Sequence, residues 1–308
     1  MTDRPSRHGK DIEPMQSLAI IEAPSVLGLR PGGVSDLPRA LRGAGLLDGF
    51  RVAREERLDP PEYDEVRDPE TAVLNPTAIA RYALTLADAV ESALDQDLFP
   101  LVLGGDCTIL LGNLLALRRR GRPGLLFLDG HTDFYQPSAE PRGEVASMEL
   151  ALATGRGPAV LTDLEGRAPL LRDEDVVAFA FRDAAESSQA GMQPLPAALH
   201  AMDLPTVREL GIEPATHQAL TALPAAPFWT HLDADVLHDN VMPAVDYRQP
   251  DGLTWPELDH VLTAALTDDR CRGLDVTIFN PHLDPTGTIT TRFTACLRRA
   301  LAARALTQ

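Results

Sequence analysis

Residues 124–133 read GLLFLDGHTD, an apolar run that changes abruptly into alternating acidic and small or polar residues. An uninterrupted apolar run of this length is typical of a strand buried on both faces of a parallel sheet. Short apolar runs of the same kind recur along the chain, at residues 17–22, 100–103, 176–181, 228–232 and 274–279. We expect each of them to form a buried strand of one sheet.

Helical segments are expected between these strands. Residues 79–94 and 109–117 carry apolar side chains at helical spacing. Thr254 and Glu257 have the spacing of a capping box at the start of a helix over residues 258–266. Strands that alternate with helices predict a doubly wound α/β fold, in which helices cover both faces of a mostly parallel sheet.

The length of 308 residues and the hydrophobic content of 44% allow one large core. We therefore expect a single α/β domain over residues 16–308. The N-terminal segment of residues 1–15 is expected to be mobile. Residues 59–76 and the proline-rich residues 193–227 are interpreted as surface excursions of this domain.

The formal net charge of -17 argues against a nucleic-acid backbone or an anionic membrane as partner, because both would repel such a surface. A small molecule is the expected substrate. Arginines cluster within residues 118–122, where we expect them to be solvated and to compensate a helix dipole.

The three cysteines, Cys107, Cys271 and Cys296, are few and far apart, which favours a reducing compartment over a disulfide framework. The N-terminus lacks the apolar region of a signal peptide. No apolar stretch approaches the roughly 18 residues needed to span a bilayer. We expect a cytoplasmic protein.

Acidic residues follow two of the predicted strands directly, at the edge where doubly wound sheets bind their ligands. Five candidate metal ligands stand there: Asp129, His131 and Asp133 after residues 124–128, and Asp233 and Asp235 after residues 228–232. Period-two spacing in extended chain places the members of each group on one side. A lone Asp-x-His-x-Asp is more often a solvated turn, and it is the two acidic strand ends together that favour a metal site.

The four carboxylates of this set, held close together, would repel one another and take up protons unless cations neutralised them. The set therefore indicates divalent metal. Carboxylate-rich chemistry with a single imidazole suits Mn²⁺-like ions, and more than four ligands favour two of them. Two ions that share bridging carboxylates can hold a hydroxide between them as the nucleophile.

These segments resemble the signature blocks of the ureohydrolase superfamily, which contains arginases, agmatinases, guanidinobutyrases and formiminoglutamases. The matching segments occur in the family's order, at residues 104–108 (GGDCT), 129–133 (DGHTD), 233–235 (DAD) and 273–281 (GLDVTIFNP). The resemblance implies an arginase-like three-layer sandwich and a homo-oligomer. It also implies hydrolysis of a linear amidine, guanidino or amide C–N bond by a metal-bridging hydroxide.

The resemblance implies a role for each ligand: Asp129 and Asp233 bridge two Mn²⁺ ions, Cys107 and Asp133 complete the first site, and His131 and Asp235 complete the second. Metal-bound carboxylates such as Asp133 would also relay protons. Arg182 and Asp183 match an Arg-Asp pair whose aspartate contacts the substrate amine in arginases. Such a pair at a strand end is as often a structural ion pair.

Cys107 departs from the family, which normally has a histidine ligand at this place. A thiolate is a softer donor, and it disfavours Mn²⁺ relative to Zn²⁺ or Fe²⁺. Cys107 either ligates, as a cysteine does in hydroxyarginine-hydrolysing relatives, or is a small buried residue at a helix start. The neighbouring Asp106 is interpreted as a support of its loop and not as a direct ligand.

Two further departures concern the substrate side. Ala146 stands at the place of a proton-shuttling histidine. The nearby Glu144 is the candidate acid in its stead, although a carboxylate at such a position is more often an ordinary surface residue. Ile278 stands at the place of a glutamate that pairs with the substrate guanidinium. We therefore predict a substrate other than L-arginine.

Two other functions remain open. A pseudoenzyme that keeps the fold and serves as a binding or regulatory protein would account for the three departures together. A histone-deacetylase-like zinc amidohydrolase would use one metal and a pair of adjacent histidines, and the sequence contains no His-His pair.

Overall fold

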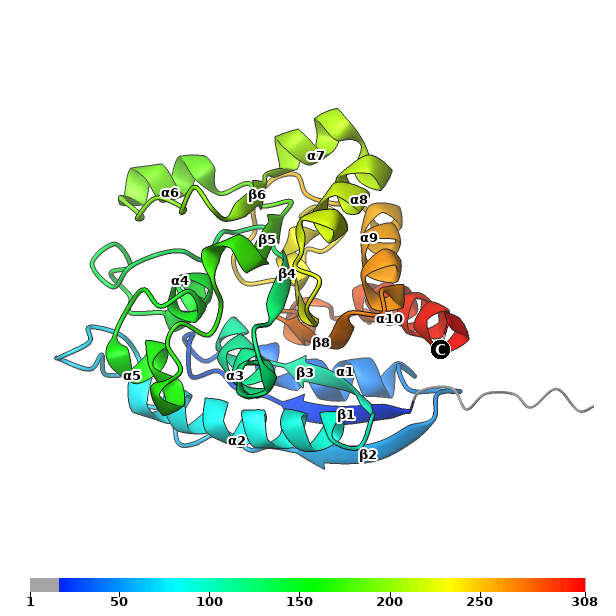
Figure 1. Ribbon diagram of the computed structural model, residues 1–308, viewed down its shortest axis with the longest axis horizontal. Coiled ribbons are helices and arrows are strands. Elements are labelled where there is room, and N and C mark those ends of the chain that lie inside the picture. Colours follow the sequence, from blue (N-terminus) through cyan, green and yellow to red (C-terminus); the bar gives the residue numbers. More distant parts are fainter. Residues whose placement is uncertain (1–16, 308) are drawn as a thin grey trace, which may run out of the picture.

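The computed structural model describes residues 17–307 and folds them around one parallel sheet of eight strands (Figure 1). The strand order is β2-β1-β3-β8-β7-β4-β5-β6. The strands are β1 (Leu18–Ala23), β2 (Val52–Arg57), β3 (Phe99–Gly104), β4 (Gly124–Leu128), β5 (Val176–Phe179), β6 (His200–Met202), β7 (Phe228–Asp233) and β8 (Cys271–Thr277). The segment of residues 1–15 lies outside the described residues.

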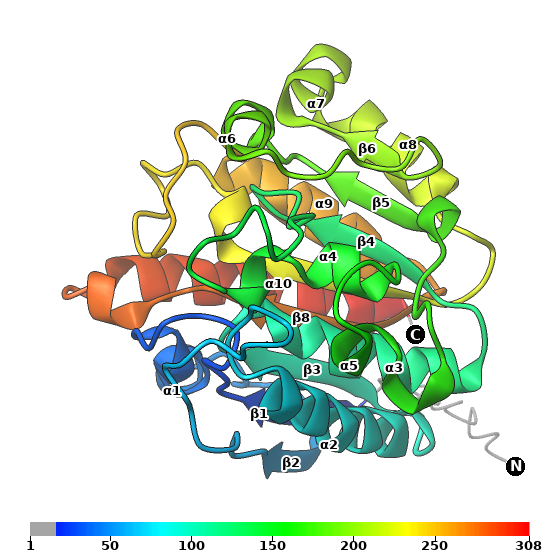
Figure 2. The same ribbon diagram turned by 90° about the vertical axis from the view of Figure 1, so that its left-hand side faces the viewer.

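Helices cover both faces of the sheet and complete a three-layer α/β sandwich (Figures 1 and 2). They are α1 (Leu37–Gly43), α2 (Pro76–Leu94), α3 (Leu110–Arg120), α4 (Glu149–Ala153), α5 (Ala159–Thr162), α6 (Ala184–Ala190), α7 (Leu204–Leu210), α8 (Ile212–Ala222), α9 (Trp255–Thr267) and α10 (Thr288–Thr307). Leu126 and Leu128 of β4 face the core under α1, α8, α9 and α10, whereas Leu125 and Phe127 face the core under α2, α3, α4 and α5. This alternation explains why the strand is apolar throughout.

The predicted doubly wound fold is confirmed, and each predicted strand and helix is present. Thr254 and Glu257 form the expected capping box at the start of α9, with the Thr254 N–H donating to the Glu257 carboxylate at 2.7 Å. The sequence reading missed β2 and β6, which are the two edges of the sheet. In β2, partly buried and exposed residues alternate because only one face is covered, so the strand has no apolar run.

Two expectations about surface segments are wrong. Residues 193–227 are not a mere excursion, because they contain β6, α7 and α8, and Val207 and Ala219 of these helices are buried. Arg119 is not solvated, because its guanidinium pairs with Asp88, Glu91 and Glu165. Within residues 17–307, no helix combines the length and apolar character needed to cross a bilayer.

Candidate metal centre

The centre of the sheet brings together the candidate residues. Strands β3, β8, β7 and β4 are neighbours in this order and all run parallel, so their carboxyl ends meet at one edge. Cys107 follows β3, Asp233 ends β7 and Asp129 follows β4 directly. The parallel strand order therefore brings together residues that are far apart in the chain. The residues at one strand end alone would not form this cluster.

His131 and Asp235 form the more open part of this cluster. His131 Nδ1 lies 2.9 Å from one oxygen of Asp235, whose other oxygen accepts a hydrogen bond from the Gly130 N–H at 3.0 Å. Asp129 accepts a hydrogen bond from the backbone N–H of His131 at 2.6 Å. Although burial opposes both shifts, the mutual attraction raises the pKa of His131 and lowers that of Asp235.

Cys107 faces the cluster from the other side. Its Sγ lies 3.0 Å from an oxygen of Asp233 and 3.3 Å from the hydroxyl of Thr277, and burial together with the Asp233 charge raises the pKa of the thiol. Asp106 points elsewhere, accepting hydrogen bonds from the Thr108 N–H at 2.8 Å and the Ser25 hydroxyl at 2.9 Å. Asp106 thus supports its loop, as expected.

Buried carboxyls crowd the interior of the cluster. Burial raises the pKa of Asp129 to about 6, with the Asp235 charge as the next cause. It raises the pKa values of Asp133 and Asp233 well above their usual range, reinforced by neighbouring carboxylates. Glu149, at the start of α4, is completely buried beside them, and its pKa is raised by the same burial. The sequence did not predict Glu149 as a site residue, because an acidic residue in the first turn of a helix ordinarily faces solvent.

His231 is the second site residue that was not predicted from the sequence. It lies in β7, fully buried, with its ring stacked on Phe127 at 4.9 Å between ring centroids. Its Nδ1 lies 2.6 Å from one oxygen of Asp275, whose other oxygen accepts a hydrogen bond from the Trp229 indole N–H. Its spacing of two residues from Asp233, on the same side of the strand, was the available signal.

Unpartnered buried atoms show that the cluster fits metal ions. Within residues 17–307, Asp129 Oδ2 and His231 Nε2 have no hydrogen-bond partner, and the carboxylate oxygens of Glu149 meet the carboxyl of Asp133 but no N–H or hydroxyl donor. Three groups of side chains have their potential ligand atoms within 4.8 Å of one another: Cys107, Asp129, His231 and Asp233; Cys107, Asp129, Asp133 and Glu149; and Asp129, His131 and Asp235. Buried acceptors without donors are costly, and divalent cations would satisfy them.

A cavity of about 310 Å³ opens over the cluster and is lined by Cys107, His131, Asp133, Asp233 and Asp235. Its wall includes Glu144, which is only 2% exposed, so the interpretation as a surface carboxylate is wrong. The Tyr247 hydroxyl donates to the Glu144 carboxylate at 2.9 Å, and the Arg142 guanidinium lies against the Tyr247 ring and 3.2 Å from Glu144. The charge of Glu144 is therefore already compensated.

Ile278 and Ala146 also line this cavity and add apolar surface to it. The backbone of Ile278 has a φ of 67°, a left-handed conformation that is costly for a β-branched residue. Its N–H donates to the Gly105 carbonyl at 2.9 Å, which fixes the segment against the loop after β3. The side chain is 4% exposed.

Arg182 and Asp183 lie beside the cavity without lining it. Asp183 accepts hydrogen bonds from the Thr132 N–H at 3.0 Å and from the Thr132 and Ser187 hydroxyls at 2.8 and 2.7 Å. Arg182 donates to the Asp235 carbonyl at 2.8 Å. In this conformation both residues brace the loops that carry Asp133 and Asp235.

The family model of the Arginase family matches residues 16–303 of the chain. The arginase of Bacillus caldovelox is 28% identical over 287 residues, which cover 88% of this chain and 93% of the relative. The solved structure of that arginase superimposes with a TM-score of 0.82 at 23% identity, covering 96% and 99% of the two chains.

Two solved structures of other hydrolases also share the fold. A formimidoylglutamase from Bacillus subtilis subsp. subtilis str. 168 gives a TM-score of 0.72 at 17% identity, covering 96% of this chain and 89% of the other. A proclavaminate amidino hydrolase from Streptomyces clavuligerus gives a TM-score of 0.69 at 19% identity, covering 95% and 93%.

Proposed function

The chain belongs to the arginase family, and from this premise we propose that it is a binuclear metal-dependent hydrolase of a linear, non-peptide C–N bond. Membership makes it a ureohydrolase-type hydrolase. The observation that carries the finer proposal is a set of buried carboxylate oxygens without hydrogen-bond donors, on Asp129 and Glu149, which lie within 4.8 Å of potential ligand atoms of residues that line one cavity. A site kept only for stability would pair these atoms or replace them with apolar groups.

In this proposal two metal ions would be held at two positions: Asp129 and Asp233 would serve both, Cys107 and Asp133 would complete the first, and His131 and Asp235 would complete the second. The oxygen-rich set favours Mn²⁺, whereas the sulfur of Cys107 favours Zn²⁺ or Fe²⁺ at the first position. The thiol contacts Asp233 within the same group of potential ligand atoms, which supports its assignment.

When bound, the two ions would lower the pKa of a shared water and stabilise the negative charge that develops on the substrate. The water oxygen adds to the sp² carbon, the C–N bond breaks, and the leaving nitrogen takes a proton. Asp133 is proposed to accept the water proton and to pass it to Glu144 on the cavity wall, which then delivers it to the leaving nitrogen. Tyr247 and Arg142 would hold Glu144 in place through the contacts described above.

The substrate is proposed to be a neutral or weakly basic small molecule. A guanidinium loses its hydration in a buried pocket, which costs several kcal/mol unless a carboxylate meets it. Ile278 offers no charge, and Glu144 and Glu140 are both paired with Arg142. The remaining glutamate of the wall, Glu186, is exposed and accepts a hydrogen bond from Gln249 at 3.2 Å. The proposed substrate contact of Asp183 falls to its Oδ1, which has no hydrogen-bond partner among residues 17–307, whereas Thr132 and Ser187 hold Oδ2. Homo-oligomeric assembly stays a prediction.

A screen of guanidino, formimino and ureido compounds, with ammonia and urea detection and Mn²⁺ or Zn²⁺ supplied, tests the proposal. Turnover that is lost in Asp133→Asn supports it. The alternative, a binding protein without turnover, is favoured by the apolar Ile278 and Ala146 in the cavity. Two bound ions per chain with no turnover of any compound class would favour that alternative, and no bound metal would contradict both the binuclear site and the hydrolytic mechanism.

A further inference from the structure

The imidazole of His231 has one nitrogen that is fixed and one that is free. Nδ1 lies 2.6 Å from Asp275, which in turn accepts from the Trp229 indole, and the ring is clamped against Phe127. A ring held in this way cannot turn to find another partner for Nε2. When Nδ1 carries the proton that binds Asp275, the lone pair of Nε2 points away from it, toward Asp129.

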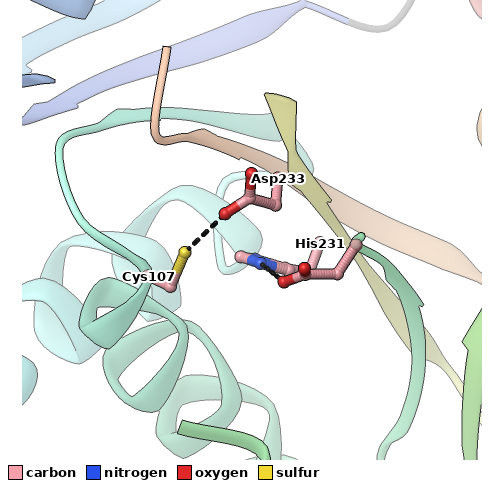
Figure 3. Close-up of side chains that lie close together, drawn as sticks. Cys107, His231 and Asp233 are labelled. Atoms are coloured by element: carbon pink, nitrogen blue, oxygen red, sulfur yellow. Dashed lines mark hydrogen bonds and ion pairs between the residues drawn. The ribbon is translucent and has the colours of Figure 1, made fainter. Parts of the chain in front are cut away.

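The free nitrogen faces an equally free oxygen. His231 Nε2 lies 4.0 Å from Asp129 Oδ2, and among residues 17–307 neither atom has a hydrogen-bond partner. A gap of 4.0 Å is too long for a hydrogen bond. It is compatible with two ligands of one cation, since such ligands each lie about 2.0–2.2 Å from the ion. Figure 3 shows His231 beside Cys107 and Asp233, whose ligand atoms belong to the same group.

We propose that His231 Nε2 is a direct ligand of the first metal ion, together with Cys107, Asp129 and Asp233. This inference rests on the metal site of the proposed function and adds to it a donor from inside the sheet. Carboxylate-bound histidines are the usual form of histidine ligands, because the carboxylate fixes the tautomer and the orientation of the ring. Asp275 and Trp229 supply this fixation here.

The assignment explains how the chain tolerates Cys107. The loop after β3 has the thiol of Cys107 at the place where relatives are expected to have an imidazole. In this proposal the imidazole of His231 in β7 is an additional ligand of the same ion. The first position then has nitrogen and sulfur donors, whereas the second keeps oxygen donors with His131. We infer that the first position prefers Zn²⁺ or Co²⁺ and the second accepts Mn²⁺.

Two substitutions of His231 separate ligation from packing. In His231→Asn the amide nitrogen takes the place of Nδ1 and keeps the hydrogen bond to Asp275, but nothing replaces Nε2. In His231→Gln the amide oxygen reaches the place of Nε2 and offers a ligand atom, whereas the bond to Asp275 is lost. His260→Asn, at an exposed site on α9, serves as the control.

Zn²⁺ and Mn²⁺ affinities are measured by competition with a metal buffer, beside thermal unfolding of the metal-free proteins. We expect His231→Asn to weaken Zn²⁺ binding by more than about 100-fold, because removing only a partner of a ligand already costs about 10–100-fold. His231→Gln should retain more affinity than His231→Asn. Equal Zn²⁺ affinity of His231→Asn and the unmodified protein would overturn the assignment, and unmodified protein that binds no metal would refute the proposed function itself.

A second experiment first tests a variant that keeps His231, so that the packing around this ring is unchanged. In the part of the chain that the structure describes, His131 and His231 are the only imidazoles in the three ligand groups. Pulsed EPR of His131→Asn loaded with one equivalent of Co²⁺ reports directly bound nitrogen. A retained imidazole coupling, absent after the further change His231→Asn, supports the assignment, and a spectrum without nitrogen coupling overturns it.

Discussion

Two cavities open at opposite ends of the same strands, and they differ in whether the polar groups around them have partners within the chain. The cavity at the amino ends, about 370 Å³, is lined by arginines that include Arg120, Arg122 and Arg272. Arg120 pairs with Asp95, and Arg122 pairs with Asp175. The cavity at the carboxyl ends is smaller, about 310 Å³, yet its lining residues Cys107 and Asp233 lie next to buried carboxyl and imidazole atoms that have no hydrogen-bond partner among residues 17–307.

The volume of a cavity therefore does not identify the functional site of this protein. The arginines at the amino ends have carboxylate or backbone-carbonyl partners within the chain, so that their hydrogen-bond donors need no ligand in this cavity. At the carboxyl ends, burial raises the pKa values of Asp133 and Asp233, and repulsion between neighbouring carboxylates raises them further. Buried ionisable groups that lack a compensating partner are typical of metal-binding and catalytic sites.

The largest expected effect is the loss of metal when a bridging residue is removed. Asp129→Ala and Asp233→Ala should each lower the content from about two ions to below about one ion per chain, because both positions lose a shared ligand. Elemental analysis measures this after dialysis. Arg122→Ala, in the cavity at the amino ends, should leave the content unchanged, and full metal content in Asp129→Ala would show that Asp129 does not bridge.

Metal removal should make stability depend on pH in a particular direction. Between the ordinary pKa of 3.8 and about 6, Asp129 of the folded metal-free protein holds a proton that the unfolded chain has released. The free energy of unfolding therefore falls as pH rises through this window, by about 3 kcal/mol for this group. The raised pKa values of Asp133 and Asp233 act in the same direction.

Bound metal removes this repulsion, so the gain in Tm on adding metal should be larger at about pH 7.5 than at about pH 5. Calorimetry of metal-free and loaded protein at both pH values checks the prediction. A gain that is the same at both values would mean that the buried carboxyls are not neutralised by metal.

Changing Ile278 to a glutamate should turn the apolar wall of the cavity into a cation-binding one. We expect the unmodified protein to release no urea from L-arginine or agmatine at a useful rate, and Ile278→Glu to raise this release by about 10-fold or more. Ile278→Gln is the control, since it has the same shape without the charge. Rapid hydrolysis of either compound by the unmodified protein would reveal an acidic anchor elsewhere in the cavity.

The smallest expected effect concerns Cys107. Cys107→His should raise the Mn²⁺ content at limiting metal by a few fold, because imidazole suits this ion better than a protonated thiol does. The buried thiol must lose its proton first, and its raised pKa opposes this. Unchanged Mn²⁺ content in the variant would show that position 107 does not face the ion.

The sequence by itself determined the layers of the fold and the acidic strand ends. Apolar runs such as residues 124–128 are long enough to require burial on both faces, and their alternation with helices leaves few arrangements. The edge strands β2 and β6 could not be predicted, because β2 is covered on one face only and β6 has three residues. The hydrophobic pattern of so short or so exposed a segment does not distinguish a strand from a loop.

The tertiary structure alone decided which side chains complete the site. Glu149 reads as an ordinary helix-start residue, and only the packing of α4 against the sheet buries it beside Asp133. His231 reads as a core residue of a strand, and only the strand order places Asp275 of β8 on one side of it and Asp129 after β4 on the other. Sequence spacing fixes which face of its own strand a side chain occupies, whereas its neighbours across strands follow from the order in which the strands pair.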